Sequence, residues 1–335
     1  MSAGIAAIAY HLPETVVDNA ALERIDPRFN AAKVLAKTGI DRRRIVAAGE
    51  CASDLAVAAA EKLFAAHGIA AERIDYLIFC TQAPDYFLPT TACVIHKRLG
   101  LRQSAGAIDM NLGCSGFIYG LGLAKGLIVS EQAARVLLLT ADTYSKFMAK
   151  TDMSVRSIFG DAAAATLIET GEGRALGSFV YGSDGEGAPN LIVPTGGLRS
   201  PEGDEPYETA SGEWRRGAPL HMNGPEIFNF TIAAIPDLVR TTLDHAGLGA
   251  EDIDLFVFHQ ANATMLEALR RKLDIPAERF WVNLAETGNT VSSTIPIALA
   301  QAQAEGRLKR GDRVMLVGFG VGYSWGACIV QWGQG

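Results

Sequence analysis

Cys114 is the first residue of this sequence whose type and place suit it to chemistry. It lies in the segment DMNLGCSG, residues 109–116, where a strand ends and a nearly uncharged helix is predicted over residues 115–130. The free N–H groups and the positive dipole end at the start of a helix stabilise a thiolate over a thiol. Because this helix is apolar almost all round, we expect it to be buried, with Cys114 at the bottom of a pocket. Cys114 is therefore a candidate nucleophile; the alternative is a small buried thiol that packs beside Gly113 and Gly116.

His259 and Asn289 are two further polar residues at places where chemistry is common. His259 ends a buried strand predicted over residues 254–259, and Asn289 lies in ETGNT, residues 286–290, a Gly-centred turn before a Ser/Thr-rich helix start. Taken singly, His259 also fits a core or loop role, and Asn289 also fits a turn or a helix cap. Their interpretation therefore depends on which residues the fold brings beside them.

The run GFGVGY, residues 318–323, is a candidate oxyanion site. It places three glycines in five residues directly after a predicted strand. Glycine lets a backbone amide come close to a reacting atom. The N–H of Val321, beside that of Cys114, could then hold an oxyanion, and a tight turn without chemistry is the alternative.

Short apolar strands alternate with helices along the chain and must position these residues. Strands are predicted over residues 73–80, 135–140, 254–259 and 313–318, and helices over residues 52–66, 115–130, 225–246 and 292–305. This alternation predicts an α/β fold in which helices cover a sheet.

The chain also contains an internal repeat. Residues 68–79 align without a gap on residues 247–258, with six of the twelve positions identical, and residues 135–145 align on residues 313–324 with one residue of slippage. Two matches in register predict a duplicated α/β unit.

The repeat predicts two halves joined in the charged turn at residues 169–174. We expect an N-terminal half, residues 1–172, to carry the nucleophile and a C-terminal half, residues 173–335, to carry the histidine and the asparagine. The residue of the first half that corresponds to His259 is Cys80. An ionisable ring at this strand end in one half only favours a functional role for it.

Composition excludes several other classes of protein. The 335 residues are 49% apolar and 20% charged, which is typical of a globular protein, and the net charge of −7 gives no general attraction to nucleic acid or anionic membrane. We expect no secretory signal and no membrane span. The five cysteines are scattered and form no CxxC pair, so we expect free thiols in a cytoplasmic protein and no metal site.

Seven segments spread over the whole chain form a recognisable set. They are GIDRRRI at residues 39–45, the cysteine segment, FGDAAAA at 159–165, MNGPEIF at 222–228, HQAN at 259–262, GNT at 288–290 and GFGVGYSWG at 318–326. Together they resemble the β-ketoacyl-acyl-carrier-protein synthase III family of the thiolase-like superfamily. The resemblance implies a five-layered α-β-α-β-α fold, internally duplicated, and usually a homodimer.

The resemblance also implies a reaction, that of an acyltransferase of fatty acid biosynthesis. Cys114 takes an acyl group from a thioester, and the N–H groups of Cys114 and Val321 hold the oxyanion. A malonyl group on acyl carrier protein then loses CO₂, while neutral His259 and the Asn289 amide hold the enolate oxygen. The resulting carbanion attacks the acyl-cysteine and gives a 3-ketoacyl thioester. No cofactor is bound permanently; coenzyme A or phosphopantetheine thioesters are the substrates.

The sequence departs from the family where coenzyme A is held. Typical members have a tryptophan and an arginine before the GI segment and an arginine before FGD, where this chain has Lys33, Lys37 and approximately Met153. The departure allows an acyl-carrier-protein donor. For substrate and carrier-protein binding we consider five residues: Lys37, Asn262 and the basic cluster Arg270, Arg271 and Lys272, whose alternative role is that of a solvated helix C-terminus.

Three other functions share part of this pattern. Papain-like proteases share the order Cys, His, Asn, but their cysteine context does not match residues 111–116 and they show no α/β duplication. Transfer of the acyl group from Cys114 to another nucleophile, without decarboxylation, stays open as the alternative enzyme. A non-enzymatic binding partner is disfavoured, because such a protein would tend to lose the nucleophile or a donor.

Overall fold

Two five-stranded sheets form the frame of the molecule. The computed structural model describes residues 2–171, 173–201, 207–208, 214–215 and 220–333. The first sheet has the strand order β1-β7-β6-β4-β5 and the second has the order β8-β16-β15-β13-β14. The strands of the first sheet are β1 (Ala3–His11), β7 (Ala162–Thr170), β6 (Arg135–Asp142), β4 (Tyr76–Cys80) and β5 (Gly106–Met110). Those of the second are β8 (Ala175–Ser183), β16 (Ser324–Gln331), β15 (Arg313–Gly320), β13 (Leu255–Phe258) and β14 (Phe280–Trp281).

The two sheets match strand for strand in direction as well as in order. In each sheet the first three strands pair antiparallel and the last three pair parallel. The registers agree too, since Tyr76 lies opposite Val136 in the first sheet and Leu255 lies opposite Val314 in the second. β4 and β13 are thus related by a shift of 179 residues, and β6 and β15 by a shift of 178.

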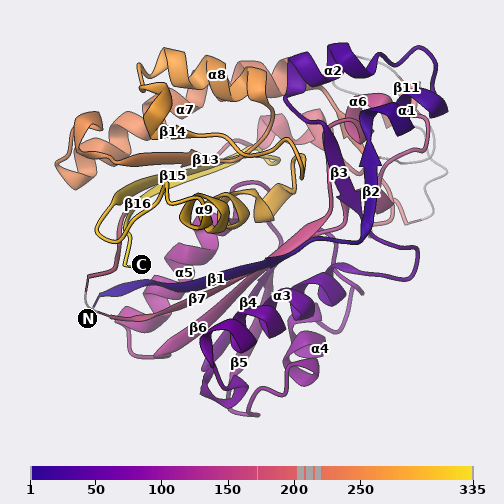
Figure 1. Cartoon of the computed structure of the whole chain (residues 1–335). Helices are drawn as coiled ribbons and strands as arrows, with labels where there is room; N and C mark the ends of the chain where they lie inside the picture. Colours follow the sequence, from indigo (N-terminus) through magenta and orange to yellow (C-terminus); the bar gives the residue numbers. More distant parts are fainter. Residues whose placement is uncertain (1, 172, 202–206, 209–213, 216–219, 334–335) are drawn as a thin grey trace.

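Helices form three layers around these sheets, so the fold is the five-layered α-β-α-β-α arrangement of the thiolase-like superfamily (Figure 1). The outer face of the first sheet is covered by α3 (Ala52–His67) and α4 (Thr91–Arg98), and that of the second by α7 (Gly224–Ala246) and α8 (Ala263–Lys272). Between the sheets lie α5 (Gly116–Val129) and α9 (Thr294–Ala304). Phe117, Ile118 and Leu121 of α5 are fully buried, as expected for a helix that is apolar almost all round.

Smaller elements complete the chain. A two-stranded ribbon, β2 (Thr15–Asp18) and β3 (Arg42–Ile45), stands beside the layers together with the helices α1 (Asn19–Ile25), α2 (Ala31–Thr38) and α6 (Met153–Arg156) (Figure 1). The remaining short strands are β9 (Leu191–Ile192), β10 (Tyr207–Glu208), β11 (Trp214–Arg215) and β12 (His221–Met222). The 3₁₀ turns are η1 (Ala71–Arg73), η2 (Tyr144–Lys146), η3 (Gly185–Asn190), η4 (Ala250–Asp252), η5 (Ala277–Arg279) and η6 (Val291–Ser293).

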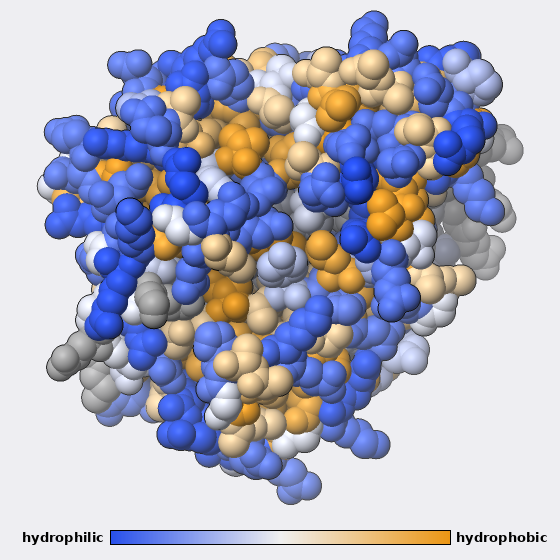
Figure 2. Space-filling model, in the orientation of Figure 1, coloured by the Kyte–Doolittle hydropathy of each residue, from blue (hydrophilic) through white to orange (hydrophobic). Residues whose placement is uncertain are grey.

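Apolar side chains concentrate between the layers rather than on the surface. One core cluster joins α5 and α9 to the facing sides of both sheets, and two others lie under the outer helices. The face drawn in Figure 2 is mainly hydrophilic, with apolar groups scattered over it. This packing fixes the ends of β5, β6, β13 and β15, where the candidate residues lie.

Candidate active site

Cys114 lies in the turn between β5 and α5 and is only 4% exposed. Its thiol sulfur faces the backbone N–H groups of Val321 and of Cys114 itself, which favour the thiolate. Burial outweighs them and raises the pKa of Cys114 to about 12, helped by the nearby carboxylate of Asp142. The amide N–H groups act in the direction expected from the helix start, and removal of water from the sulfur has the larger effect.

The glycines at the end of β15 make room for this turn. A Cβ atom on Gly320 would lie 2.8 Å from Cβ of Cys114 and 2.9 Å from its sulfur, and one on Gly318 would lie 2.9 Å from Cα of Ser115. No side chain fits at either position. The sequence-based expectation of a close backbone approach here agrees with this geometry.

His259 and Asn289 lie side by side. Nε2 of His259 is 3.3 Å from Nδ2 of Asn289, and the two residues are 2% and 5% exposed. Nδ1 of His259 is 2.7 Å from the hydroxyl of Thr294, and Oδ1 of Asn289 accepts a 2.9 Å hydrogen bond from the N–H of Val291. Burial lowers the pKa of His259 to about 3, so the ring is neutral. Both side chains are thus held by one short segment, residues 289–294.

A single cavity of about 1340 Å³ is lined by Cys114, His259 and Asn289. The three residues lie at its buried end with Phe319 and Gly320. At its exposed end are Asp26, Arg28, Lys33 and Lys37 of the α1–α2 region, and Asn262 and Thr264 at the start of α8. The space between is mostly apolar, with Leu191, Met222, Ile227 and Phe228 among the lining residues. A long, thin substrate with a charged outer part and an apolar inner part fits such a cavity.

The backbone of Asn289 is held by residues 157–160, which overlap the FGDAAAA segment at residues 159–165. The N–H of Asn289 donates to the carbonyl of Ile158 at 2.9 Å, and the N–H of Gly160 donates back to the carbonyl of Asn289 at 3.0 Å. Arg43, which is 1% exposed, donates to the carbonyl of Ser157 at 2.8 Å and so stabilises the backbone of residues 157–160.

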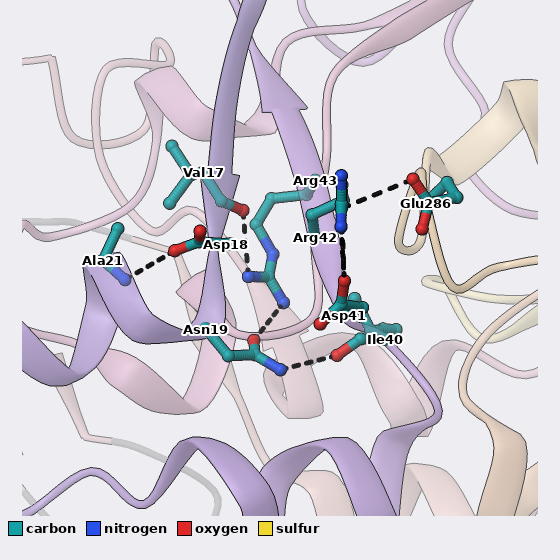
Figure 3. A network of polar contacts seen from close by, with 9 residues as sticks. All are labelled: Val17, Asp18, Asn19, Ala21, Ile40, Asp41, Arg42, Arg43 and Glu286. Carbon is teal, nitrogen blue, oxygen red and sulfur yellow. Dashed lines mark hydrogen bonds and ion pairs between the residues drawn. The ribbon is translucent and has the colours of Figure 1, made fainter.

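Arg43 reaches across the ribbon to Val17 and Asn19 (Figure 3). It donates to the Val17 carbonyl at 3.1 Å and to Oδ1 of Asn19 at 2.8 Å. Burial lowers the pKa of Arg43 to about 10, which leaves it charged at neutral pH. Beside it, Arg42 pairs with Asp41 at 2.9 Å and with Glu286 at 3.4 Å. β3 turns every second side chain inward, so Arg42 is exposed, Arg43 is buried and Arg44 is half-buried. The run of three arginines in the sequence does not tell which of them is buried.

The residues predicted to bind substrate or carrier protein occupy different places. Lys37 and Asn262 line the cavity, and Asn262 caps α8 by accepting from the N–H of Met265 at 2.9 Å. Lys33 and Met153, at the positions of the family's coenzyme A clamp, line it as well. The cluster at the end of α8 does not: both Arg270 and Arg271 pair with Glu267, at 2.8 Å and 2.5 Å, and Lys272 is exposed.

The described residues show neither a cluster of metal ligands nor a membrane-spanning helix. Over the ranges that the structure covers, no group of three or more His, Cys, Asp or Glu side chains is placed to hold a metal ion. In the same part of the chain, no helix is long and apolar enough to cross a membrane.

The fold and the site together define a thiolase-like enzyme whose nucleophile would be a cysteine. Comparisons with known proteins agree: residues 108–185 match the family model described as 3-oxoacyl-[acyl-carrier-protein (ACP)] synthase III, and residues 243–332 match that of its C-terminal part. A β-ketoacyl-[acyl-carrier-protein] synthase III of Syntrophomonas wolfei is 35% identical over 100% of this chain and 98% of its own length.

Solved structures give the same answer. A crystal structure of a 3-oxoacyl-(acyl-carrier-protein) synthase III is 52% identical, with a TM-score of 0.95 over 99% of this chain and 100% of that one. A 3-oxoacyl-(acyl-carrier protein) synthase from Burkholderia xenovorans is 40% identical, with a TM-score of 0.91 over 99% of this chain and 95% of that one. The chain belongs to the β-ketoacyl-[acyl-carrier-protein] synthase III family.

Proposed function

We propose that the chain forms a 3-ketoacyl thioester by decarboxylative Claisen condensation of an acyl group on Cys114 with malonyl-acyl carrier protein. One observation carries the proposal: two separate sets of N–H donors face the buried end of one cavity. The amides of Cys114 and Val321 surround the sulfur, and the side chains of His259 and Asn289 form the other set. Condensation generates two oxyanions in succession, and each needs donors of its own.

The first half-reaction transfers the acyl group to sulfur. Cys114 attacks the thioester carbonyl, the C=O oxygen becomes an oxyanion between the Cys114 and Val321 amides, and the thiol of the donor leaves with the proton that Cys114 loses. Because burial raises the pKa of Cys114, the sulfur gives up its proton as the new bond forms and not beforehand. An acyl chain can then lie against Phe159 and Leu191, which are buried beside Cys114.

The second half-reaction uses the other donors. The malonyl carboxylate leaves as CO₂, and its electron pair passes to the thioester carbonyl oxygen as an enolate. The Thr294 hydroxyl lies 2.7 Å from Nδ1 of His259 and 3.2 Å from the Val291 carbonyl. When it donates to Nδ1, the nearer acceptor, the proton of the neutral ring is on Nε2, beside the Asn289 amide. Two donors 3.3 Å apart can bind one oxygen atom. One such preorganised donor typically contributes about 3 to 4 kcal/mol, or a 10² to 10³ factor in rate.

The second step then closes the cycle. The enolate carbon attacks the acyl carbonyl on Cys114, and the amides of Cys114 and Val321 hold the new oxyanion. The cysteine then leaves as a thiolate and takes up a proton from solvent. The sequence of two half-reactions predicts ping-pong kinetics. Coenzyme A or carrier-protein thioesters serve as donors, and neither a metal ion nor a permanent cofactor takes part.

An acidic carrier protein is the partner that suits the exposed end of the cavity. Lys33 and Lys37 are exposed cations on α2, which packs against α8 through a hydrogen bond from the Thr264 hydroxyl to the Lys37 carbonyl. Lys272 adds an exposed cation at the end of α8, whereas Arg270 and Arg271 both pair with Glu267. Complementary charge of this kind raises the rate of docking and sets its orientation.

A homodimer and a cytoplasmic place of action belong to the same proposal. Tyr86, Phe87 and Leu88 are 61%, 77% and 83% exposed, and Ile108 on the edge strand β5 is 46% exposed. A second copy would cover these apolar groups. The five free cysteines suit a reducing compartment.

The test follows each half-reaction separately. Purified enzyme is incubated with octanoyl thioesters of coenzyme A and of carrier protein, and an acyl adduct is sought by intact mass; CO₂ release is then measured with malonyl-carrier protein. We expect Cys114→Ala to form no adduct and Cys93→Ala, which changes an exposed thiol, to behave as the wild type.

Three results would count against the proposal. Normal condensation by Cys114→Ala would exclude this nucleophile. An adduct on Cys114 that never consumes malonyl units would favour the alternative, acyl transfer to another nucleophile. Asn289→Ala should slow CO₂ release by about 10² to 10³, and an unchanged rate would exclude its role in the second step.

A further inference from the structure

The buried end of the cavity has a counterpart elsewhere in the molecule, to which both halves also contribute. The strand shifts of 179 and 178 residues place Cys80 at the position of His259 and Asp142 at that of Gly320. The matching starts of α5 at Gly116 and α9 at Thr294 pair Cys114 with Ser292. Contacts agree with this correspondence. Thr294 touches the ring of His259, and at the matching position in the first half a Cβ on Gly116 would lie 2.3 Å from the sulfur of Cys80.

In the counterpart, a side chain occupies the position that corresponds to Gly320 in the active site. Gly320 has no side chain and leaves space over Cys114, whereas Asp142 extends a fully buried carboxylate over Ser292. That carboxylate accepts hydrogen bonds from the Ser292 N–H at 3.2 Å, from the Ser292 hydroxyl and from the Gln82 N–H at 2.8 Å. An N–H equivalent to the oxyanion donor of Cys114 is thus bound permanently by a protein carboxylate.

Ser292 belongs to the segment that holds both enolate donors. It lies in η6, three residues after Asn289 and two before Thr294. Val291, between them, has a φ of 55°, an unfavourable value for a β-branched residue that neighbouring contacts must hold in place. The Val291 N–H is bound by Asn289, and the next two residues are bound by the end of β6.

The end of β6 therefore supports this turn at two adjacent points. Asp142 binds Ser292, and Thr140 binds the Ser293 hydroxyl through its side chain at 2.9 Å and its carbonyl at 3.1 Å. Asp142 holds both the N–H and the hydroxyl of Ser292, and the Ser292 side chain also contacts the thiol of Cys80. Movement of η6 would displace the Asn289 amide and the Thr294 hydroxyl together.

We propose that Asp142 is a positioning residue for the second half-reaction, which acts through Ser292 to hold the Asn289 amide and the Thr294-oriented ring of His259 at the spacing that binds an enolate. This inference rests on the proposed function. The same carboxylate also makes Cys114 harder to ionise, because its charge lies close enough to oppose formation of a thiolate.

The two roles of Asp142 predict opposite effects on the two half-reactions. The other titratable groups that face it are Cys80, Cys114, Tyr144 and Asp161. Burial raises the pKa of Asp142 to about 7, so at pH 9 it carries its charge. Replacement by asparagine keeps the shape, removes that charge and weakens the bonds to Ser292. A residue with only a general structural role would affect both half-reactions alike.

The experiment uses the full chain with Asp142→Asn, Ser292→Ala and, as a matched control, Thr166→Val. Thr166 is equally buried, on β7, and its hydroxyl has no hydrogen-bond partner among the residues described. Reactivity of Cys114 is measured by alkylation with iodoacetamide at pH 9. The second step is measured as CO₂ release from malonyl-carrier protein by enzyme whose Cys114 is already alkylated, so the first step contributes nothing.

We expect Asp142→Asn to be alkylated faster than the wild type and to release CO₂ at least 10-fold more slowly, a fraction of the roughly 10² to 10³ that a whole donor is worth. Ser292→Ala should leave alkylation unchanged and slow CO₂ release, and Thr166→Val should change neither. Wild-type CO₂ release from Asp142→Asn and Ser292→Ala, or an equal fall in both measurements, would overturn the inference. Absence of CO₂ release by the wild type would instead contradict the proposed function.

Discussion

Burial holds two groups at the end of the cavity in their neutral forms. It raises the pKa of the Cys114 thiol to about 12 and lowers that of the His259 imidazole to about 3. An uncharged imidazole is a hydrogen-bond donor and no proton source of consequence at neutral pH. The chemistry therefore depends on where N–H groups point more than on acid–base exchange.

The low pKa of His259 predicts how acid affects stability. The folded pKa of about 3 is below the unfolded value of 6.5, so the neutral ring contributes stability above pH 6.5 that is lost as the pH falls toward 3. Asparagine or glutamine at this position does not titrate. We expect the free energy of unfolding of the wild type, relative to His259→Gln, to fall by about 2 kcal/mol between pH 7 and pH 5.

Urea denaturation of both proteins at the two pH values measures this difference. Asp142 titrates in both proteins, so its opposite contribution cancels in the comparison. A difference that stays constant would mean that His259 ionises normally in the folded protein, and one that grows in acid would mean that folding raises its pKa.

The three residues that lie in one cavity, Cys114, His259 and Asn289, could be predicted from the sequence. Each follows a strand or precedes a helix and carries a distinctive side chain. The sequence did not reveal Asp142 or Arg43. Their partners Ser292 and Ser157 are 150 and 114 residues away along the chain, and nothing local signals such contacts. The net pKa of Cys114 could not be predicted from the sequence for a related reason, since the depth of burial depends on elements from both halves.

At the scale of elements, the end of β15 decides whether the nucleophile has space. Gly320→Ala would place a methyl group 2.9 Å from the sulfur of Cys114, closer than atoms of this kind approach. We expect acylation of Cys114 to fall about 10²-fold, the loss typical of a reacting atom displaced by about 1 Å, while the protein stays folded.

Gly126→Ala is the matched control for that substitution. Gly126 lies in α5, and a Cβ there meets no atom within 4 Å. Alanine in a helix is favoured over glycine by about 0.5–1 kcal/mol, so this variant should be slightly more stable and fully active. Intact mass after incubation with an acyl thioester measures acylation of both variants. Equal acylation of Gly320→Ala and the wild type would exclude the close approach of β15.

Element boundaries were predicted less well than element types. The strand expected from residue 73 begins at Tyr76, because residues 71–73 form a 3₁₀ turn. The helix expected from residue 292 begins at Thr294, since Val291–Ser293 are held as η6 by contacts with β6. In both cases the apolar pattern was correct, and hydrogen bonds at the end of the element, which the pattern does not encode, set the boundary.

At the scale of the molecule, we propose that residues 1–172 and 173–335 are two copies of one unit. The strand orders and directions of the two sheets support this division. Residue 172, at the proposed boundary, lies outside the described residues, between β7 and β8. The repeat could be predicted from the sequence because two of its segments kept their residue identities. Most other matching elements, such as α4 and α8, kept only their places in the fold.

The proposed homodimer gives a prediction at the same scale. Phe87→Asp combined with Leu88→Asp places charge on the most exposed apolar loop residues near β4, and we expect the protein to become a monomer. Leu198→Asp, at a leucine that is 90% exposed in another loop, should leave the dimer intact. Sedimentation velocity distinguishes the two. A wild type that sediments as a monomer, or a double variant that stays dimeric, would count against this interface.

The position of α5 between the two sheets affects how the protein unfolds. This helix packs against β4, β6 and β7 on one side and against β8, β15 and β16 on the other. Loss of either sheet would leave much of its apolar surface in water. We therefore expect both halves to unfold in one cooperative transition. Neither half should stay folded after the other has unfolded.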